Sequence, residues 1–214
     1  MFSTVKKRQN IQDKQKSVVL ANSAHGGFDG GAIAPDGTVE KDINLEICKT
    51  LCELLRCGGY DVIMTRSADV STDDVENATI ASRKKSDLRN RLELMEDYPD
   101  AIFVSVHLNK FTTSTANGSQ IFYSGTTAES ARLGEHIRAS IVELLQPYNK
   151  RVNKQATSGT YLLYNATVPA VLVECGFLSN EKDLQLLKTE EYQDKMAFCI
   201  FCGITDYLTE NREI

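Results

Sequence analysis

This 214-residue sequence lacks the patterns that mark membrane-spanning, secreted and nucleotide-binding proteins. It has no apolar run near the ~18 residues that a membrane-spanning helix needs, and no signal-peptide pattern opens it. The nucleotide-binding patterns G-x-G-x-x-G and the P-loop with its Lys-Ser/Thr are absent too. A formal net charge of -5 argues against nucleic acid as a partner. We therefore expect neither a membrane span nor a phosphate loop nor a nucleic-acid binder.

The composition is that of an ordinary globular protein, with 42% apolar and 25% charged residues. Its length suits one large domain with a full hydrophobic core. Residues 1–16 are polar and basic without a packing pattern, and we expect them to form a loose N-terminal arm. No composition shift or long linker divides residues 17–214, so one compact domain is predicted there.

The cysteines also follow a pattern, and they fall at positions 48, 52, 57, 175, 199 and 202. Cys48 and Cys52 are spaced i, i+4 on a helical pattern, and Cys199 and Cys202 are spaced i, i+3 on another. Thiolate zinc ligands usually flank short loops instead. Inside an amphipathic helix a free cysteine behaves as a small apolar residue. We expect buried, reduced thiols and no disulfide framework.

Short β-branched runs alternate with longer helical patterns along the chain, which indicates an α/β fold with a largely parallel sheet. The predicted strands are Ser17–Asn22, Tyr60–Thr65, Ala101–Val106, Ser119–Tyr123, Thr160–Leu163 and Ala170–Val173. The predicted helices are Lys41–Cys57, Ser82–Met95, Glu129–Leu145, Glu181–Leu187 and Glu191–Leu208. The sequence thus predicts a single domain with a twisted, mostly parallel sheet of about six strands flanked by helices.

Four side chains stand where a strand-like run ends or a helix begins. They are His25, Glu40, His107 and Glu174. In open α/β sheets, ligands and catalytic groups converge at the carboxyl ends of the strands. Catalytic zinc requires two imidazoles, a carboxylate and an open fourth position, with a further carboxylate free to act as a base. Together the four residues suggest a zinc hydrolase.

Each of these residues has a plainer interpretation, which the sequence leaves open. His25 lies beside glycines and suits a hydrogen-bonding turn residue. Glu40 suits the positive end of a helix macrodipole. His107 suits a histidine that is satisfied within the core. The sequence position of each residue, taken alone, does not identify it as a metal ligand.

Glu174 has its own alternative. It follows four buried strand residues, and an unpaired buried carboxylate is costly, so it could form a salt bridge with Arg66 or Lys41. The remaining histidine, His136, lies in the middle of a helical pattern. We expect it on the surface or in packing and not at a metal.

Six segments carry a family resemblance. They are Ala24–Ala32, Val39–Leu45, Val62–Arg66, Arg83–Leu92, Ser105–Asn109 and Pro169–Asn180. In this order they resemble the zinc-dependent N-acetylmuramoyl-L-alanine amidases of the amidase_3 type. The likeness extends from Val18 to Leu208 and is strongest to the germination-specific spore-cortex amidases.

The resemblance implies one zinc ion held by His25, Glu40 and His107, with Glu174 as catalytic acid and base. It implies cleavage of the amide that joins the lactyl group of N-acetylmuramic acid to L-alanine of the peptidoglycan stem peptide. It also implies a twisted mixed sheet of the zinc-exopeptidase, phosphorylase/hydrolase-like type. Residues 17–214 would then be an amidase catalytic domain.

One segment departs from the family pattern. The family usually carries Asp-Pro-Gly before the first His-Gly-Gly, whereas this chain has Asn22-Ser23-Ala24. Asn22 keeps a hydrogen-bond acceptor but loses the negative charge, and such outer contacts orient ligands and tune a metal. We expect metal binding to persist and the strength of the activity to be the property affected.

A peptidoglycan substrate implies an extracytoplasmic protein of the cell wall or spore cortex, so the missing leader suggests a trimmed sequence or another export route.

Some family members carry a helix that plugs the zinc site. The short His107–Gly118 and Thr65–Thr79 connections leave little room for one, so no obligatory activator is expected. The alternatives are a metallopeptidase or deacylase acting on another amide, and a catalytically inactive wall-binding module.

Overall fold

Six strands form one mixed sheet in the computed structural model, which describes residues 17–75 and 78–210. They are β1 (Val18–Ser23), β2 (Asp61–Met64), β3 (Ile102–Asn109), β4 (Gln120–Tyr123), β5 (Lys154–Gln155) and β6 (Ala170–Phe177). Their order is β2-β1-β3-β6-β4-β5, and the first four run parallel. β4 is antiparallel to β6, and β5 is parallel to β4. The predicted mostly parallel, mixed sheet is confirmed, whereas the expected arm over residues 1–16 lies outside the described residues.

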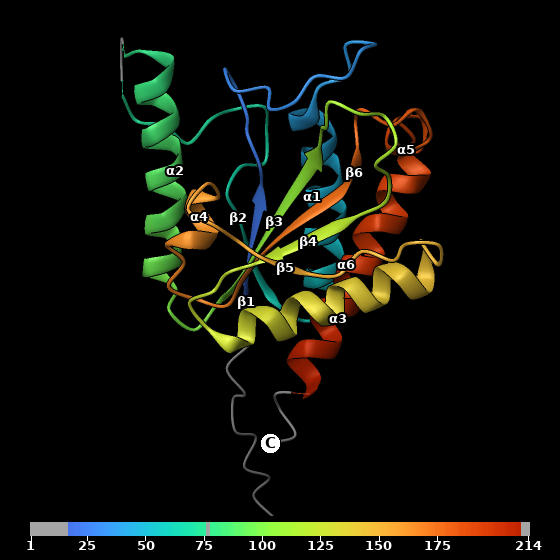
Figure 1. Ribbon diagram of the computed structural model, residues 1–214. Coiled ribbons are helices and arrows are strands. Elements are labelled where there is room, and N and C mark those ends of the chain that lie inside the picture. The colour runs from blue at the N-terminus through green and yellow to red at the C-terminus, as the bar shows by residue number, and fades with distance from the viewer. Residues whose placement is uncertain (1–16, 76–77, 211–214) are drawn as a thin grey trace, which may run out of the picture.

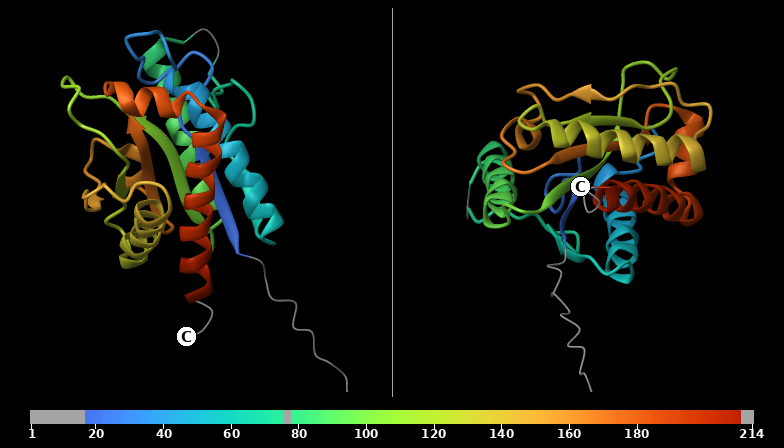
Figure 2. Two further views of the ribbon diagram at one scale, coloured as in Figure 1. Left: turned by 90° about the vertical axis from the view of Figure 1, so that its right-hand side faces the viewer. Right: turned by 90° about the horizontal axis from the view of Figure 1, so that it is seen from below.

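In the same part of the chain, six helices pack around the sheet (Figures 1 and 2). They are α1 (Glu40–Cys57), α2 (Ile80–Asp97), α3 (Ala128–Leu144), α4 (Tyr161–Tyr164), α5 (Glu181–Leu187) and α6 (Glu190–Glu210). Five of them agree with the predicted helices to within two residues at each end. None of these helices combines the length and apolar composition needed to cross a membrane.

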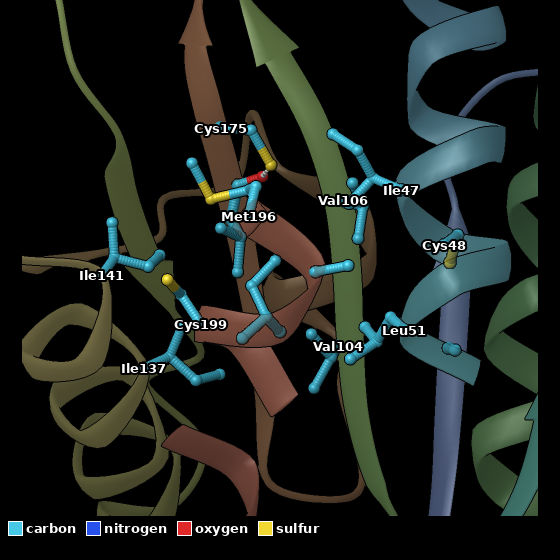
Figure 3. Packing of buried hydrophobic residues seen from close by; sticks show 14 of the residues in the cluster. Ile47, Cys48, Leu51, Val104, Val106, Ile137, Ile141, Cys175, Met196 and Cys199 are labelled. Carbon is cyan, nitrogen blue, oxygen red and sulfur yellow. Dashed lines mark hydrogen bonds between the residues drawn. The ribbon is translucent and has the colours of Figure 1, made fainter. Parts of the chain in front are cut away.

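The two faces of the sheet pack against different helices, because successive strand residues point to opposite sides. Val104 and Val106 of β3 join a core with side chains of α1, α3 and α6, part of which Figure 3 shows. Phe103, the residue before Val104 on β3, joins a second core on the opposite face with Met95 of α2 and Leu163 of α4. In Figure 1, α2 and α4 accordingly lie to the left of the strands, and α1 and α6 to the right. One face therefore carries three long helices and the other only α2 and a single helical turn.

One strand prediction is wrong, and one strand of the sheet was not predicted. The predicted strand Thr160–Leu163 is instead the short helix α4, in which Leu162 and Leu163 are both buried. A short apolar run does not by itself distinguish a strand from a turn of helix. The edge strand β5 was not predicted, because Lys154 and Gln155 are exposed and polar and show no strand pattern.

The cysteines are free, as predicted. Cys48, Cys52, Cys175 and Cys199 are buried, and all four belong to the larger core. The prediction of burial is wrong for Cys57, which is exposed at the end of α1, and Cys202 is only half-buried. Cys57 lies in the last turn of its helix, where the chain leaves the core.

Gly203 sets the distance between α3 and α6. A Cβ at this position would lie 2.5 Å from the Cα of Ile137 and 2.7 Å from its backbone nitrogen. No rotation of a side chain relieves a clash with backbone. We therefore expect Gly203→Ala to lower the free energy of unfolding by roughly 1–3 kcal/mol, despite the better helix propensity of alanine.

Urea denaturation measures this effect, and Gly159→Ala is the control. A Cβ at Gly159 would meet nothing closer than 3.7 Å, so this variant should unfold like the wild type. A Gly203→Ala protein as stable as wild type would show that α3 and α6 can separate at no cost.

Candidate metal centre

The four predicted residues lie at one edge of the sheet, where β1, β3 and β6 run in the same direction. His25 follows β1 by two residues, and Glu40 is the first residue of α1. His107 and Glu174 lie inside β3 and β6 and face each other in register. Since paired residues of parallel strands share a face, their side chains emerge on the same side of the sheet. The sequence pattern predicted this for the three residues at strand ends, and Glu40 joins them from the start of α1.

Glu40 is the centre of the arrangement. Its Oε1 lies 3.1 Å from Nδ1 of His107 and 3.3 Å from Nε2 of His25. The ligand atoms of these three residues all lie within 4.8 Å of one another. Burial would raise the pKa of the Glu40 carboxyl, but hydrogen bonds from His107 and His25 hold it far below its usual range. The three side chains could hold a metal ion.

Backbone groups fix the Glu40 carboxylate from behind. The amide of Ala32 donates to Oε2 at 2.8 Å, and the amide of Leu108 donates to Oε1 at 3.0 Å. Gly31 leaves the space that the carboxylate fills, because a Cβ there would lie 2.6 Å from Oε2 and 2.6 Å from the His25 ring. With a φ of +70°, position 31 is unfavourable for any other residue. The glycine-rich loop is therefore shaped around Glu40 and His25.

His25 is oriented by a carboxylate that the sequence did not single out. Oδ2 of Asp29 lies 3.0 Å from its Nδ1, and Lys84 pairs with the other oxygen of Asp29 at 2.9 Å. Burial would lower the pKa of His25, but the hydrogen bonds to Asp29 and Glu40 outweigh it and raise the pKa to about 9. Asp29 lies four residues after His25 in the glycine-rich loop. That spacing was the signal available in the sequence.

Among residues 17–75 and 78–210, Glu174 forms no salt bridge. Arg66 donates to backbone carbonyls and Lys41 pairs with Asp69 at 2.7 Å, so neither supports the alternative interpretation. Its Oε2 is shielded from solvent and has no hydrogen-bond partner among the described residues. Burial, reinforced by the charge of Glu40, raises the pKa of the Glu174 carboxyl to about 8. A buried acid of this kind beside a candidate metal site suits proton transfer better than structural support.

Two buried arginines hold the turn that carries His25. Arg66 donates from Nε to the carbonyl of Ser23 at 3.1 Å and from Nη2 to that of Ala24 at 3.1 Å. Arg91 donates to the carbonyls of Ser23 at 2.9 Å and His25 at 2.8 Å. His25 has a φ of +60°, a left-handed conformation that is unfavourable for a non-glycine residue and must be stabilised by its surroundings. We refer to these contacts as the arginine clamp.

Asn22 belongs to the same network. Its Oδ1 accepts from Nη1 of Arg91 and from Thr65 at 2.9 Å, and its Nδ2 donates to Ser105 at 2.7 Å. The charge of Arg91 is balanced by Asp87, whose carboxylate lies 2.8 Å from Nε. The asparagine therefore satisfies the hydrogen bonds at this position, and Arg91 keeps an anionic partner without an aspartate at position 22.

His136 takes no part in the site. It lies on α3, where its Nε2 is 2.8 Å from a carboxylate oxygen of Glu210 and its ring packs against Tyr207. With 29% of its side chain exposed, it is the surface residue that the sequence predicted.

Two small cavities adjoin His107 on the face covered by α2 and α4. One, of about 170 Å³, has charged residues such as Lys84 and Arg91 in its walls. The other, of about 180 Å³, is walled by apolar side chains such as Phe103 and Leu163. Both share His107, Leu88 and Leu162 as a boundary, and the candidate metal centre thus opens toward the thinner side of the fold.

Residues 19–206 match the Amidase_3 family, described as N-acetylmuramoyl-L-alanine amidase. The chain is 34% identical over 193 residues to the germination-specific N-acetylmuramoyl-L-alanine amidase of Bacillus subtilis, a match that covers 90% of this chain and 80% of that relative. The CwlD amidase from Clostridioides difficile, solved in complex with the GerS lipoprotein, has a TM-score of 0.87 and 40% identity. That match covers 92% of this chain and 100% of the other.

A further solved structure, the N-acetylmuramoyl-L-alanine amidase AmiC2 of Nostoc punctiforme, has a TM-score of 0.77 and 30% identity, and covers 91% of this chain and 98% of that one. These matches confirm the predicted fold class and the family resemblance found in the sequence. They extend over nearly all of the described residues, including the four that converge at the sheet edge. The chain belongs to the Amidase_3 family of N-acetylmuramoyl-L-alanine amidases.

Proposed function

We propose that this peptidoglycan amidase is a zinc enzyme in which His25, Glu40 and His107 hold the metal and Glu174 transfers protons. The observation that carries the proposal is the convergence of two imidazole nitrogens and one carboxylate oxygen within 4.8 Å of one another. This is the donor set of catalytic zinc, whereas calcium and magnesium take oxygen ligands. Three protein ligands leave a fourth position for the reaction.

When bound, zinc supplies Lewis acidity, which acidifies the attacking water and stabilises negative charge on the carbonyl oxygen of the scissile amide. Glu174 takes a proton from the attacking water and later passes one to the nitrogen of the departing L-alanine. Its position beside His107 and its unpartnered Oε2 support this role. Asp29 holds the Nδ1 proton of His25, which leaves Nε2 free to bind the metal.

The two cavities beside His107 support a substrate with both polar and apolar groups next to the reacting amide. N-acetylmuramoyl-L-alanine carries a methyl group on each side of that amide, on the lactyl and the alanyl carbon. The apolar cavity would take such groups, and the other cavity, whose walls include Asp29, Lys84 and Asp87, would take polar groups of the stem peptide.

We also propose that the enzyme acts outside the cytoplasm, on peptidoglycan of the cell wall or spore cortex; the Bacillus subtilis relative is named as germination-specific. The GerS lipoprotein in the CwlD complex raises the question of an activating partner. We retain the prediction of activity without one. In support, the side chains of His25 and His107 keep 23% and 20% of their surface exposed, so the described segments leave access to them.

Digestion of purified peptidoglycan by the protein alone tests this function. We expect mass spectrometry to show stem peptides with free L-alanine amino termini and glycan strands with free lactyl carboxylates. Cleavage at other amides would favour the metallopeptidase or deacylase alternative, and zinc binding without any turnover the inactive wall-binding module. Turnover that appears only with an added partner would contradict the prediction of independent activity.

His25→Ala and His107→Ala should each remove the metal as well as the activity, since each deletes one of three ligands. Elemental analysis after dialysis measures the zinc content, and His136→Ala is the matched control because His136 lies on the surface. Full zinc occupancy in both site variants would rule out this ligand assignment.

Glu174→Gln should lower turnover by roughly 10²–10⁴-fold, the usual cost of losing a general acid/base, while zinc content stays near wild type. Glutamine keeps the size of the side chain but cannot accept the proton. Zinc stoichiometry and kcat are measured on the same preparation. Loss of zinc from the folded variant would make Glu174 a ligand, and normal turnover would remove it from the mechanism.

Arg91→Lys should weaken zinc binding roughly 10–100-fold, the range found when a group that orients a metal ligand is removed. Lysine keeps the charge but cannot donate to Ser23 and His25 at once. Competition with a chelating dye measures the Kd for zinc. The control is Arg89→Lys, an exposed neighbour on α2. A lower Tm with an unchanged Kd would mean that the clamp supports the fold only.

A further inference from the structure

A groove lies on the outer surface where α1, α3 and α6 meet, helices that Figure 2 shows beside one another when viewed from below. It has a volume of about 750 Å³ and shares no residue with the candidate metal centre. Its walls come from Thr50, Glu53 and Leu54 of α1, Leu144 of α3, and Glu190–Cys199 of α6. We call it the α1–α6 groove.

The groove exposes large apolar side chains. Phe198 is 48% exposed and Leu144 is 52% exposed, and both line the groove together with Leu54. Single exposed apolar residues are common on protein surfaces, whereas Phe198 and Leu144 lie in the same groove, where one occupant could cover both. An occupant with apolar anchors would remove them from water.

The rim of the groove is acidic. Glu53 and Glu190 take part in none of the ion pairs found among the described residues, and Asp194 accepts only from the hydroxyl of Thr50, at 2.9 Å. The one cation of the groove, Lys195, is already paired with Glu191 at 2.6 Å. The groove thus offers apolar anchoring points surrounded by negative charge without a matching cation, and it suits a basic segment with apolar residues.

We propose that the occupant is the N-terminal segment of the same chain, residues 1–16. This segment contains five Lys or Arg and one Asp, a net charge of +4, so residues 17–214 carry -9 of the total of -5. It also contains Phe2, Val5 and Ile11 beside the basic run Lys6-Lys7-Arg8. Phe2 and Val5 bind among the apolar side chains of the groove, and the basic run faces its acidic rim.

The point where this segment joins the domain is close to the groove. The amide of Asp61 donates to the carbonyl of Ser17 at 3.2 Å, and the amide of Tyr60 donates to that of Leu55 at 3.1 Å. Ser17 is thus bonded to Asp61, whose neighbour Tyr60 is bonded to Leu55 in the last turn of α1, next in sequence to Leu54. Sixteen extended residues reach about 50 Å, which exceeds the length of the groove along α1 and α6. A covalently attached segment also binds at high effective concentration, so weak contacts suffice.

Limited trypsin digestion of the full-length protein tests the proposal, because trypsin cleaves after Lys6, Lys7 and Arg8. Intact-mass spectrometry follows the loss of the segment. We expect Glu53→Lys/Glu190→Lys to be cleaved roughly tenfold faster than wild type, since two reversed charges shift the bound fraction by about that factor. Phe198→Asp should act in the same direction. The matched control is Glu96→Lys/Asp97→Lys, which changes the charge equally on exposed positions of α2.

Carbodiimide cross-linking provides the direct measurement of contact. In the wild type, we expect zero-length links from Lys6 or Lys7 to Glu53 or Glu190, which disappear at high salt. Equal cleavage rates in wild type, groove variants and control, without these links, would overturn the proposal. Protection that disappears on dilution would also overturn it, because the groove would then bind a second copy of the chain. Cross-links from the segment to other surfaces only would also overturn the α1–α6 groove as its binding site.

Discussion

The hydrogen bonds of the arginine clamp are the constraint on which the site depends. Arg66 and Arg91 bind three consecutive carbonyl oxygens, those of Ser23, Ala24 and His25, and so hold the chain in a left-handed turn where the strand ends. Without that turn, His25 would continue in the direction of β1 and its Nε2 would not face Glu40. A buried guanidinium is costly unless its donors are satisfied, and backbone carbonyls at a strand end satisfy them. The two buried guanidinium groups thus fix the backbone of the turn, and the turn orients the imidazole of His25.

Backbone hydrogen bonds also fix the position of Glu40. Both of its oxygens are bound by backbone amides, one from the glycine-rich loop and one from β3, so the carboxylate is fixed by the elements that carry the two histidines. His25, Glu40 and His107 therefore move together if they move at all. Glu174 differs, because its position comes from the strand register and its carboxyl has no hydrogen bond to hold Oε2. The site combines three restrained side chains with one whose Oε2 has no hydrogen-bond partner among the described residues, as the proposed proton transfer requires.

Much of this was predictable from the sequence, for physical reasons that vary with the residue. The sheet and five helices were predicted because their apolar periodicity is strong. His25, His107 and Glu174 were identified as candidates because each follows a buried run. α4 was mistaken for a strand, since four residues are too few for periodicity to decide between period 2 and period 3.6. Arg66 and Arg91 could not be placed, because their partners are backbone carbonyls more than 40 residues away, which no local pattern encodes.

The pairing of His107 with Glu174 separates what is fixed in this enzyme from what can vary. Their backbones belong to neighbouring parallel strands, which keep a spacing of about 4.8 Å whatever the surrounding side chains are. The cavity walls that would determine substrate specificity come instead in part from the face covered by α2 and α4, in particular from residues 159–163 around α4. Residues 159–163 could therefore change the shape of this cavity without moving either strand. The reacting groups would be unchanged.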